Sequence, residues 1–227
     1  MLTERRFFTR SPYQKARSII DQVDSCRFAT VVITLGIMLR MLVALRTQNY
    51  DFTSYRIVAD ILNQGGNVYA ETTRYNYGPI WLLIIRGLDL LTFRNEMVFR
   101  YLLTLLLSLV DVGIMTILWR RFGRFAACLF LLNPISIVIT GYHSQFDNLA
   151  ILLGMLALIY IDDDFENGLT KRKFAGLLIL GLSLVTKHIL FLFPLWLAVK
   201  QKGWSHKAAV FLIPIMVFFV GFLPYVA

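Results

Sequence analysis

Three short polar stretches, set between long apolar segments, contain most of the side chains in this sequence that could do chemistry. The first is residues 48–77, which carries Asp51 near its start and ends in an Arg-Tyr-Asn-Tyr sequence. The second is Gly-Tyr-His-Ser-Gln-Phe-Asp at 141–147, and the third is Thr-Lys-His at 186–188. Together they supply carboxylates, imidazoles, a lysine and an arginine, which are groups that move protons or stabilise developing negative charge.

The chemistry that these groups allow is proton abstraction next to a phosphate. Asp51 could act as a general base toward a hydroxyl, and the cations Arg74 and Lys187 could stabilise a phosphate leaving group. Asp51 and Asp147 are the two acids that could hold a divalent cation. Plainer roles stay open: Asp51 as a helix N-cap, Arg74 as an interfacial anchor, and Lys187 and His188 as snorkelling side chains. No nucleophile elbow, phosphate-binding loop or HExxH zinc motif occurs.

The composition identifies the class of protein. Of the 227 residues, 57% are hydrophobic and only 16% are charged, whereas a soluble domain carries about 25% charged residues. Several apolar runs approach the roughly 20 residues that span a bilayer, so we predict an all-α, polytopic membrane protein. The net charge of +9 comes from basic residues between the apolar runs, where they set topology; we therefore expect no nucleic-acid partner. Cys26 and Cys128 provide neither a disulfide framework nor metal-ligand spacing.

The N-terminal region, residues 1–27, carries six Lys/Arg and is predicted to be a cytoplasmic basic leader. The first helix, residues 28–45, is expected to stay uncleaved as a membrane anchor. Arg40 is expected near the outer interface, with its guanidinium snorkelling to water. Residues 28–227 then form one transmembrane module. Its first loop, residues 46–96, lies on the non-cytoplasmic side of a bacterial plasma membrane or of the endoplasmic reticulum.

The first outer loop is predicted to begin with an interfacial helix. Phe52, Tyr55, Ala59 and Leu62 recur at helical spacing and form an apolar stripe. A helix this short cannot span a bilayer, so we expect it to lie in the plane of the interface. Two consecutive glycines at 65–66 predict its end.

Residues 78–93 are apolar but contain Arg86 and Asp89, three apart on one helical face. A full crossing would place this charged pair deep in the membrane, at a cost of several kcal/mol unless paired. The basic residues give a second argument. Two later loops carry three Lys/Arg each and the loop between them carries none. Placing the two basic loops in the cytoplasm makes 78–93 a short helix on the outer side.

This arrangement predicts seven spans, with the N-terminus in the cytoplasm and the C-terminus outside. Residues 174–200 are interpreted as two short helices that meet near 186–188 at the outer face, with one tilted helix as the alternative. Asp111, in the middle of one span, is expected to pair with an arginine of a neighbouring helix. The remaining spans after the first are predicted at 97–119, 125–140, 148–161 and 208–226.

The order of these features resembles the GT-C superfamily of polyprenyl-phosphate-sugar-dependent glycosyltransferases. The likeness is greatest to the catalytic subunit of GPI mannosyltransferase I and to related bacterial mannosyltransferases, and it covers most of residues 28–226. Asn133-Pro134 before the 141–147 stretch, and Lys187 before Pro194, are similar to later luminal elements of the family. Asp111 falls where that subfamily places an acid. The matching residues of the first loop are Asp51, Gly66, Tyr69, Arg74, Tyr75, Tyr77 and Pro79.

The resemblance implies an integral-membrane glycosyltransferase that moves a sugar, mannose by the same likeness, from a polyprenyl-phosphate donor to an acceptor hydroxyl with inversion. Asp51 would be the general base at the non-cytoplasmic face, and Arg74, Lys187 and His188 would bind the donor phosphate. Asp51 and Asp147 would hold Mg²⁺ or Mn²⁺ if a metal is used. The implied partners are the lipid-linked sugar, membrane lipid and, as an alternative, a second membrane subunit. The residues expected to position the acceptor are Tyr75, Tyr77, His143, Gln145 and Asp147.

Two features depart from the family pattern. These mannosyltransferases carry Asp-x-Asp in the first loop, whereas this chain has Asn49-Tyr50-Asp51 and keeps only the second acid. The family also continues into further helices, so we expect a minimal enzyme, half of a split enzyme or a truncated product. Two other classes stay open: a non-catalytic partner that binds polyprenyl phosphate, and a transporter or lipid flippase. His143 and Asp147 could also be an ordinary interfacial pair.

Overall fold

The computed structural model describes residues 12–46, 48–161 and 168–226, with side chains from residue 25 onward. Every regular element in these ranges is a helix, which confirms the predicted all-α class. In chain order they are α1 (Pro12–Arg46), α2 (Tyr50–Asn63), α3 (Val68–Glu71), α4 (Pro79–Leu91), α5 (Glu96–Phe122), α6 (Arg124–Leu131), α7 (Pro134–Gly141), α8 (Asp147–Ile161), α9 (Lys171–Thr186), the 3-10 turn η2 (His188–Leu190), α10 (Phe193–Val199), α11 (Trp204–Phe222) and the 3-10 turn η3 (Leu223–Tyr225).

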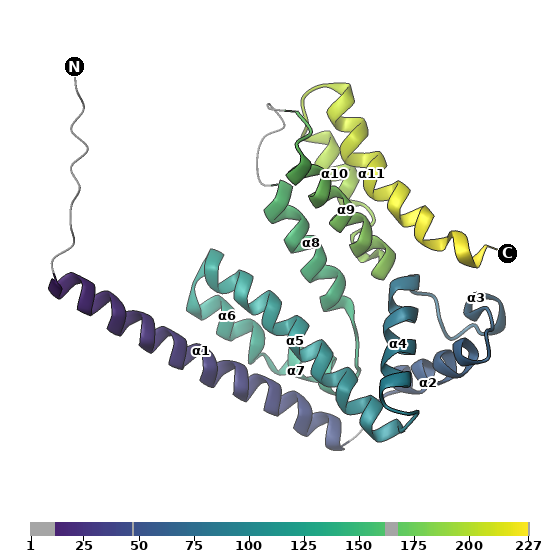
Figure 1. Ribbon diagram of the computed structural model, residues 1–227, viewed down its shortest axis with the longest axis horizontal. Coiled ribbons are helices and arrows are strands. Elements are labelled where there is room, and N and C mark those ends of the chain that lie inside the picture. Colours follow the sequence, from purple (N-terminus) through teal and green to yellow (C-terminus); the bar gives the residue numbers. More distant parts are fainter. Residues whose placement is uncertain (1–11, 47, 162–167, 227) are drawn as a thin grey trace.

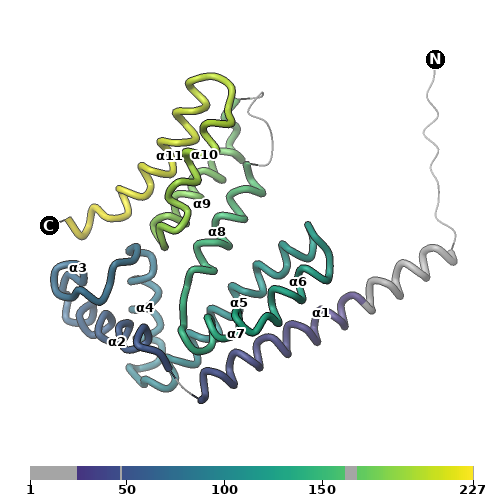
Figure 2. Tube along the Cα trace, turned by 180° about the vertical axis from the view of Figure 1, so that it is seen from behind, coloured from purple at the N-terminus to yellow at the C-terminus, as the bar shows by residue number. Residues whose placement is uncertain are grey.

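The helices form three groups (Figures 1 and 2). In the first, α1 runs beside α5, α6 and α7. In the second, α9 packs between α8 and α11, and α10 packs on α11. The third consists of α2, α3 and α4. Because α5 contacts α8, and α4 contacts both α5 and α9, the three groups meet at a single junction.

The long apolar helices are those of a membrane protein. Three segments are long and apolar enough to cross a bilayer: Ser25–Arg46, Glu96–Phe122 and Trp204–Tyr225. Two bent pairs would raise the number to five in the described residues: α6 with α7, bent by 46°, and α9 with the η2–α10 segment, bent by 119°. The apolar helix α8 is shorter, with 15 residues. Seven spans and the sidedness of the loops stay predictions.

The segment 174–200 contains two helices rather than one tilted helix. Helix α9 ends at Thr186, and its C-cap Lys187 has extended backbone angles, φ −155° and ψ 128°. The chain then reverses by 119° through η2 into the seven-residue α10. The prediction of two helices meeting at 186–188 is therefore confirmed. Helix α10 begins next to Pro194, whose ring suits the first turn of a helix.

Arg40 does not snorkel to an interface; that prediction is wrong. Its side chain is fully buried, and its Nε lies 2.8 Å from Asp111 Oδ2 on α5. The guanidinium also donates to the carbonyls of Gly36 and Leu131 and to the Ser136 hydroxyl. A charge this deep is retained because each of the three guanidinium nitrogens has a hydrogen-bond partner. The expected pairing of Asp111 with an arginine of a neighbouring helix is confirmed.

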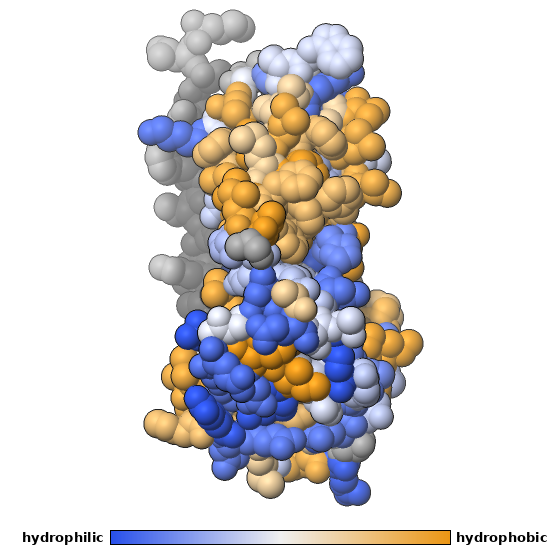
Figure 3. Space-filling view, turned by 90° about the vertical axis from the view of Figure 1, so that its right-hand side faces the viewer, coloured by the Kyte–Doolittle hydropathy of each residue, from blue (hydrophilic) through white to orange (hydrophobic). Residues whose placement is uncertain are grey.

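The predicted apolar stripe of α2 exists, but it faces protein rather than lipid. Phe52, Tyr55, Ala59 and Leu62 are all buried in a core shared with α4 and α5. Helix α2 ends at Asn63, and Gly65 follows with φ +78°, as the glycine pair predicts. Seen from the side that carries α11 and α3, the surface is largely hydrophobic over α11 and largely hydrophilic over α2 and α3 (Figure 3).

Helix α4 is short, as predicted, but its charged residues do not pair with each other. Asp89 is fully buried and forms an ion pair with Arg56 of α2. It also accepts a hydrogen bond of 2.6 Å from Asn63 Nδ2. Arg86 is exposed. The Asp89 carboxylate therefore fixes α4 to α2 instead of serving an internal pair.

Candidate functional site

The three polar stretches meet at the junction of the helix groups. Asp51 lies in the first turn of α2, residues 142–146 link α7 to α8, and Lys187 follows the end of α9. Asp51 Oδ2 accepts a hydrogen bond of 2.7 Å from Gln145 Nε2. Gln145 Oε1 accepts one of 3.1 Å from Lys187 Nζ. The Gln145 amide thus connects the acid to the lysine, with its oxygen toward the cation and its nitrogen toward the anion.

Asn49 holds Asp51 from a second side. The side chain of Asn49 is the N-cap of α2 and accepts from the Tyr50 amide at 2.6 Å, so the N-cap alternative for Asp51 is wrong. Asn49 Nδ2 donates to Asp51 Oδ2 at 3.0 Å and lies 2.6 Å from His143 Nδ1. An amide nitrogen only donates, so this contact is a hydrogen bond in the tautomer that leaves His143 Nδ1 unprotonated. Asp51 Oδ1 accepts no hydrogen bond from the described residues.

The Lys187 ammonium contacts a carboxylate and two aromatic rings of the same cluster. Its Nζ lies 2.9 Å from the Asp147 carboxylate. It also lies 4.6 Å from the ring centre of Tyr77 and 5.0 Å from that of Phe146. The lysine side chain is only 12% exposed, so these attractions are screened less than those of a surface pair. Asp147 pairs with this lysine and His143 with an asparagine, so the interfacial His143–Asp147 pair is not formed.

A glycine allows the 74–79 corner to reach the lysine turn. The Gly78 amide donates to the Thr186 carbonyl at 3.2 Å. A Cβ at Gly78 would lie 1.5 Å from the carbonyl oxygen of Val185, so no other residue permits this approach. The buried Tyr75 hydroxyl donates to the Gly78 carbonyl at 2.7 Å and fixes the corner from behind. The start of α4 is therefore attached to the end of α9.

Aromatic rings support the linker between α7 and α8. Phe146 is fully buried and stacks on Trp81 of α4, with ring centres 4.0 Å apart and planes at 12°. Tyr55 and Tyr77 make edge contacts with the same ring. The Tyr55 hydroxyl donates to the carbonyl of Ser144, which has φ +53°. Positive φ is uncommon outside glycine, and such strained residues concentrate at functional sites.

Tyr77 is close enough to both acids to sense their charge. Burial raises the pKa of Tyr77, and the carboxylates of Asp51 and Asp147 raise it further. Burial likewise raises the pKa of Tyr55 well above its ordinary value. Since an unperturbed phenol already ionises only near pH 10, Tyr77 stays neutral at physiological pH. It can therefore donate a hydrogen bond to a ligand but does not act as the proton acceptor.

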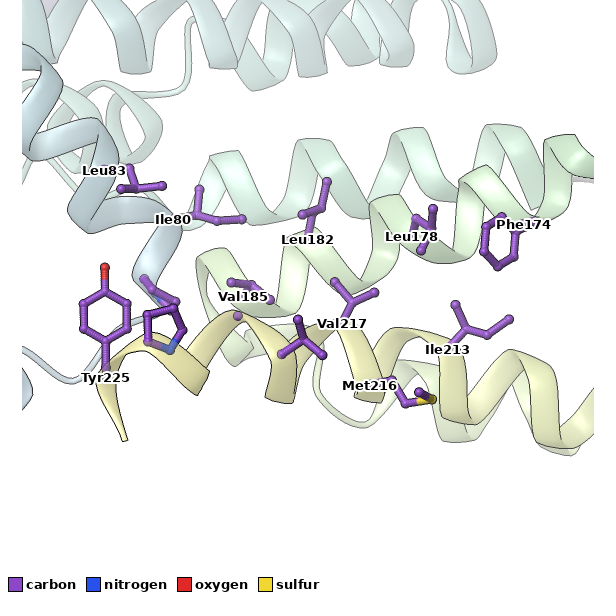
Figure 4. A pocket seen from close by; sticks show the side chains of 14 residues that line it. Ile80, Leu83, Phe174, Leu178, Leu182, Val185, Ile213, Met216, Val217 and Tyr225 are labelled. Atoms are coloured by element: carbon purple, nitrogen blue, oxygen red, sulfur yellow. The ribbon is translucent and has the colours of Figure 1, made fainter. Parts of the chain in front are cut away.

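An apolar groove of about 760 Å³ begins beside this cluster, between α4, α9 and α11. Figure 4 shows it extending from Tyr225 and Ile80 at one end to Phe174 at the other. Phe174 and Val185 are eleven residues apart on α9, which corresponds to about 17 Å at 1.5 Å per residue. Val185 and Pro79 both line the groove and directly flank the contact between Gly78 and Thr186. The polar cluster and the groove therefore share one boundary.

Three of the predicted site residues make no hydrogen bond to Asp51, Gln145 or Lys187. The Arg74 guanidinium stacks 3.6 Å from the ring centre of Tyr50 and donates to its carbonyl at 3.4 Å. His188 is exposed at the start of η2 and makes no side-chain hydrogen bond to the described residues. Tyr75 uses its hydroxyl inside the protein. The phosphate-binding roles of Arg74 and His188 and the acceptor-binding role of Tyr75 stay predictions.

The two acids considered for a divalent cation have separate partners. Asp147 is bound to Lys187, and Asp51 is bound to two amide groups. Within the described residues, no three His, Cys, Asp or Glu side chains group in a way that could hold a metal.

Sequence reasoning missed three residues that build the site. Asn49 was noted only as the replacement of an acid, although it caps α2 and touches both Asp51 and His143. Phe146, inside the 141–147 stretch, was not singled out although its neighbours were. Asn148 donates to Asp111 Oδ1 at 2.5 Å and thus joins the first turn of α8 to the buried ion pair. The available signal was position, since Asn49 lies two residues before Asp51, and Phe146 and Asn148 flank Asp147.

Comparisons with protein-family models, with curated proteins and with solved structures found no match. The chemistry of the site is therefore inferred from its own contacts: a carboxylate with one open oxygen, an ion-paired lysine and an apolar groove at one junction of helices.

Proposed function

We propose that this protein is a membrane glycosyltransferase that uses a polyprenyl-phosphate-linked sugar. Asp51 is the general base, Gln145 and Asn49 orient it, and Lys187 faces the donor phosphate. Mannose is the proposed sugar, and a hydroxyl at the non-cytoplasmic face is the proposed acceptor. Both rest on the resemblance to the GT-C mannosyltransferases described above.

The proposed reaction is a single displacement at the anomeric carbon. Asp51 Oδ1 removes the proton of the acceptor hydroxyl as its oxygen forms a bond to the anomeric carbon. The bond between that carbon and the phosphate oxygen breaks, and its electron pair leaves with the polyprenyl phosphate. Lys187 stabilises the negative charge that this phosphate gains. Attack opposite the leaving group inverts the configuration.

The observation that carries the proposal is the shared boundary of the polar cluster and the apolar groove. A lipid-linked sugar phosphate is an amphiphile, with a polar head and a long hydrocarbon tail. The groove supplies about 17 Å of apolar surface along α9, and its end lies next to the turn that bears Lys187. A soluble nucleotide-sugar donor would have no use for such a groove, so the lipid-linked donor is favoured.

The ion pair of Lys187 with Asp147 has a defined place in this proposal. Asp147 forms an ion pair with a lysine that is only 12% exposed. An incoming phosphate can take the place of that carboxylate because both are oxygen acceptors of negative charge. Asp147 would then be released toward the acceptor. Exchange of partners avoids leaving an unpaired cation in a site that is largely desolvated.

The test is sugar transfer by the purified full chain, with polyprenyl-phosphate mannose as donor and a panel of hydroxyl acceptors. Asp51→Asn is expected to slow transfer by about 10²–10⁴-fold, the usual contribution of general-base catalysis. Asp60→Asn is the matched control, because Asp60 is an exposed acid on the same helix, and it should transfer at the wild-type rate. Transfer by Asp51→Asn at the wild-type rate would refute the proposal.

A second candidate is a non-catalytic subunit that binds polyprenyl phosphate for another enzyme. The observation that favours it is Asn49, an amide in place of the first acid of the family pattern, which engages Asp51 and His143. In that case the wild-type chain binds the lipid phosphate, transfers no sugar, and co-purifies with a larger membrane protein. Lys187→Gln would weaken lipid-phosphate binding under either function, whereas Asp51→Asn would affect only the enzyme.

A further inference from the structure

We infer that the hairpin of α10 and α11 holds a second lipid, an anionic phospholipid, at a site distinct from the groove described above. The two helices border an apolar groove of about 450 Å³. Its floor is made of aliphatic and aromatic side chains, including Leu195, Phe211 and Leu212, and Lys207 lies on its lining. The inference does not depend on the proposed glycosyltransferase reaction.

The hairpin that borders this groove carries positive and no negative side chains. Three lysines lie in the hairpin, and no acidic residue occurs between residues 193 and 222. Lys200 Nζ lies 3.5 Å from the ring centre of the exposed Trp196, and Lys207 Nζ lies 5.4 Å from that of Trp204. Neither of these two lysines forms an ion pair with a carboxylate among the described residues. They therefore keep their charge available for an anion.

The length of the groove along α11 matches the headgroup and the first part of an acyl chain of a phospholipid. Trp204 is 86% exposed at the start of α11, and tryptophan and lysine together mark the level of the headgroups in membrane helices. From Trp204 to Leu212 the helix rises about 12 Å at 1.5 Å per residue. A phosphate at the lysines would therefore place the beginning of an acyl chain against Phe211 and Leu212.

Charge complementarity selects an anionic over a zwitterionic lipid. Each lysine near the headgroups contributes about 1 kcal/mol toward an anionic lipid. Two lysines then correspond to a preference of about thirtyfold. A zwitterionic lipid has a cationic group beside its phosphate and loses this advantage. Burial of the acyl chains alone would favour neither of the two lipids.

The experiment uses the two tryptophans that flank the groove as reporters. The full chain is placed in phosphatidylcholine micelles, and phosphatidylglycerol with brominated acyl chains is titrated in while tryptophan fluorescence is recorded. Bromine quenches an indole only at short range, and Trp81 is fully buried. With Trp119 replaced by phenylalanine in every sample, quenching reports a lipid beside Trp196 and Trp204. Brominated phosphatidylcholine, titrated in the same way, gives the reference affinity. We expect phosphatidylglycerol to bind about thirtyfold more tightly.

Two variants separate charge from shape. Lys200→Gln with Lys207→Gln should remove the preference for phosphatidylglycerol and leave the affinity for phosphatidylcholine unchanged. Ala208→Phe, which adds a ring inside the groove, should weaken the binding of both lipids. The matched control is Lys171→Gln with Arg120→Gln, which removes two exposed positive charges elsewhere and should keep the preference.

Three results would overturn the inference. The first is equal affinity of the wild-type chain for the two lipids. The second is an unchanged preference after both hairpin lysines are replaced. The third is loss of the preference in the Lys171→Gln/Arg120→Gln control, which would mean that net charge rather than this groove attracts the lipid.

Discussion

Replacing Arg40 by methionine is expected to destabilise the protein strongly, because Asp111 would be left charged and unpaired in the interior. Both side chains are fully buried and their ion pair measures 2.8 Å. Removing one partner of such a pair typically costs about 3–5 kcal/mol. The cost arises at Asp111, which would keep only the hydrogen bonds from Thr140 and Asn148. Methionine retains most of the packing volume, so the loss reports the charge rather than a cavity.

The assay is reversible unfolding of the purified chain in mixed micelles, followed by far-ultraviolet circular dichroism during titration with a denaturing detergent. Arg86→Met is the matched control, since Arg86 is exposed on α4 and its loss should change stability by less than about 0.5 kcal/mol. The double variant Arg40→Met/Asp111→Leu should recover most of the stability lost in Arg40→Met, because replacing a whole buried pair with apolar residues is often neutral.

The reasoning is refuted if Arg40→Met and Arg86→Met lower stability equally. It is also refuted if the double variant is less stable than Arg40→Met by the whole stability loss of the Asp111→Leu single variant. Either result would mean that the two charges do not depend on each other. The double variant is expected to be less destabilised than the sum of the two single variants by at least about 2 kcal/mol.

Three further predictions concern the junction itself. Gly78→Ala should separate the α4 corner from α9, because a Cβ would lie 1.5 Å from the Val185 carbonyl oxygen; we expect a loss of at least about 1–3 kcal/mol and faster proteolysis of residues 187–192. Phe146→Ala should cost about 3–5 kcal/mol and shift the emission of the buried Trp81, with which it stacks, to longer wavelength. Asp89→Leu should destabilise by about 3 kcal/mol in the same unfolding assay, because Arg56 and Asn63 both lose their buried acceptor.

Much of the fold follows from composition and periodicity. The apolar runs predicted the helices, the glycine pair predicted the end of α2, and the basic residues predicted that 78–93 is a short helix. The break at Lys187 was also predicted, as one of two alternatives. These features are local, because each depends on a few neighbouring residues and on the cost of placing charge in a membrane.

The partners of charged residues were not predictable from spacing. Asp89 pairs with Arg56, 33 residues away, and no partner for it was predicted. Arg40 was assigned to the interface because an unpaired arginine belongs there, but its partner Asp111 lies 71 residues away. Sequence spacing indicates which residues share a helical face; it does not indicate which other helix covers that face.

The candidate site shows the same division. The sequence by itself determined which residue types were available and that Asp51, the 141–147 stretch and Lys187 each follow or precede a helix end. Only the tertiary structure decided that Gln145 joins Asp51 to Lys187, that Asn49 rather than Asp51 caps α2, and that Arg74 and His188 are hydrogen-bonded to none of Asp51, Gln145 and Lys187. The physical reason is that a hydrogen-bond network depends on distances of about 3 Å between side chains, and those distances are set by how whole helices pack. Gly78 illustrates it: its need for glycine comes from one carbonyl of α9, more than a hundred residues along the chain.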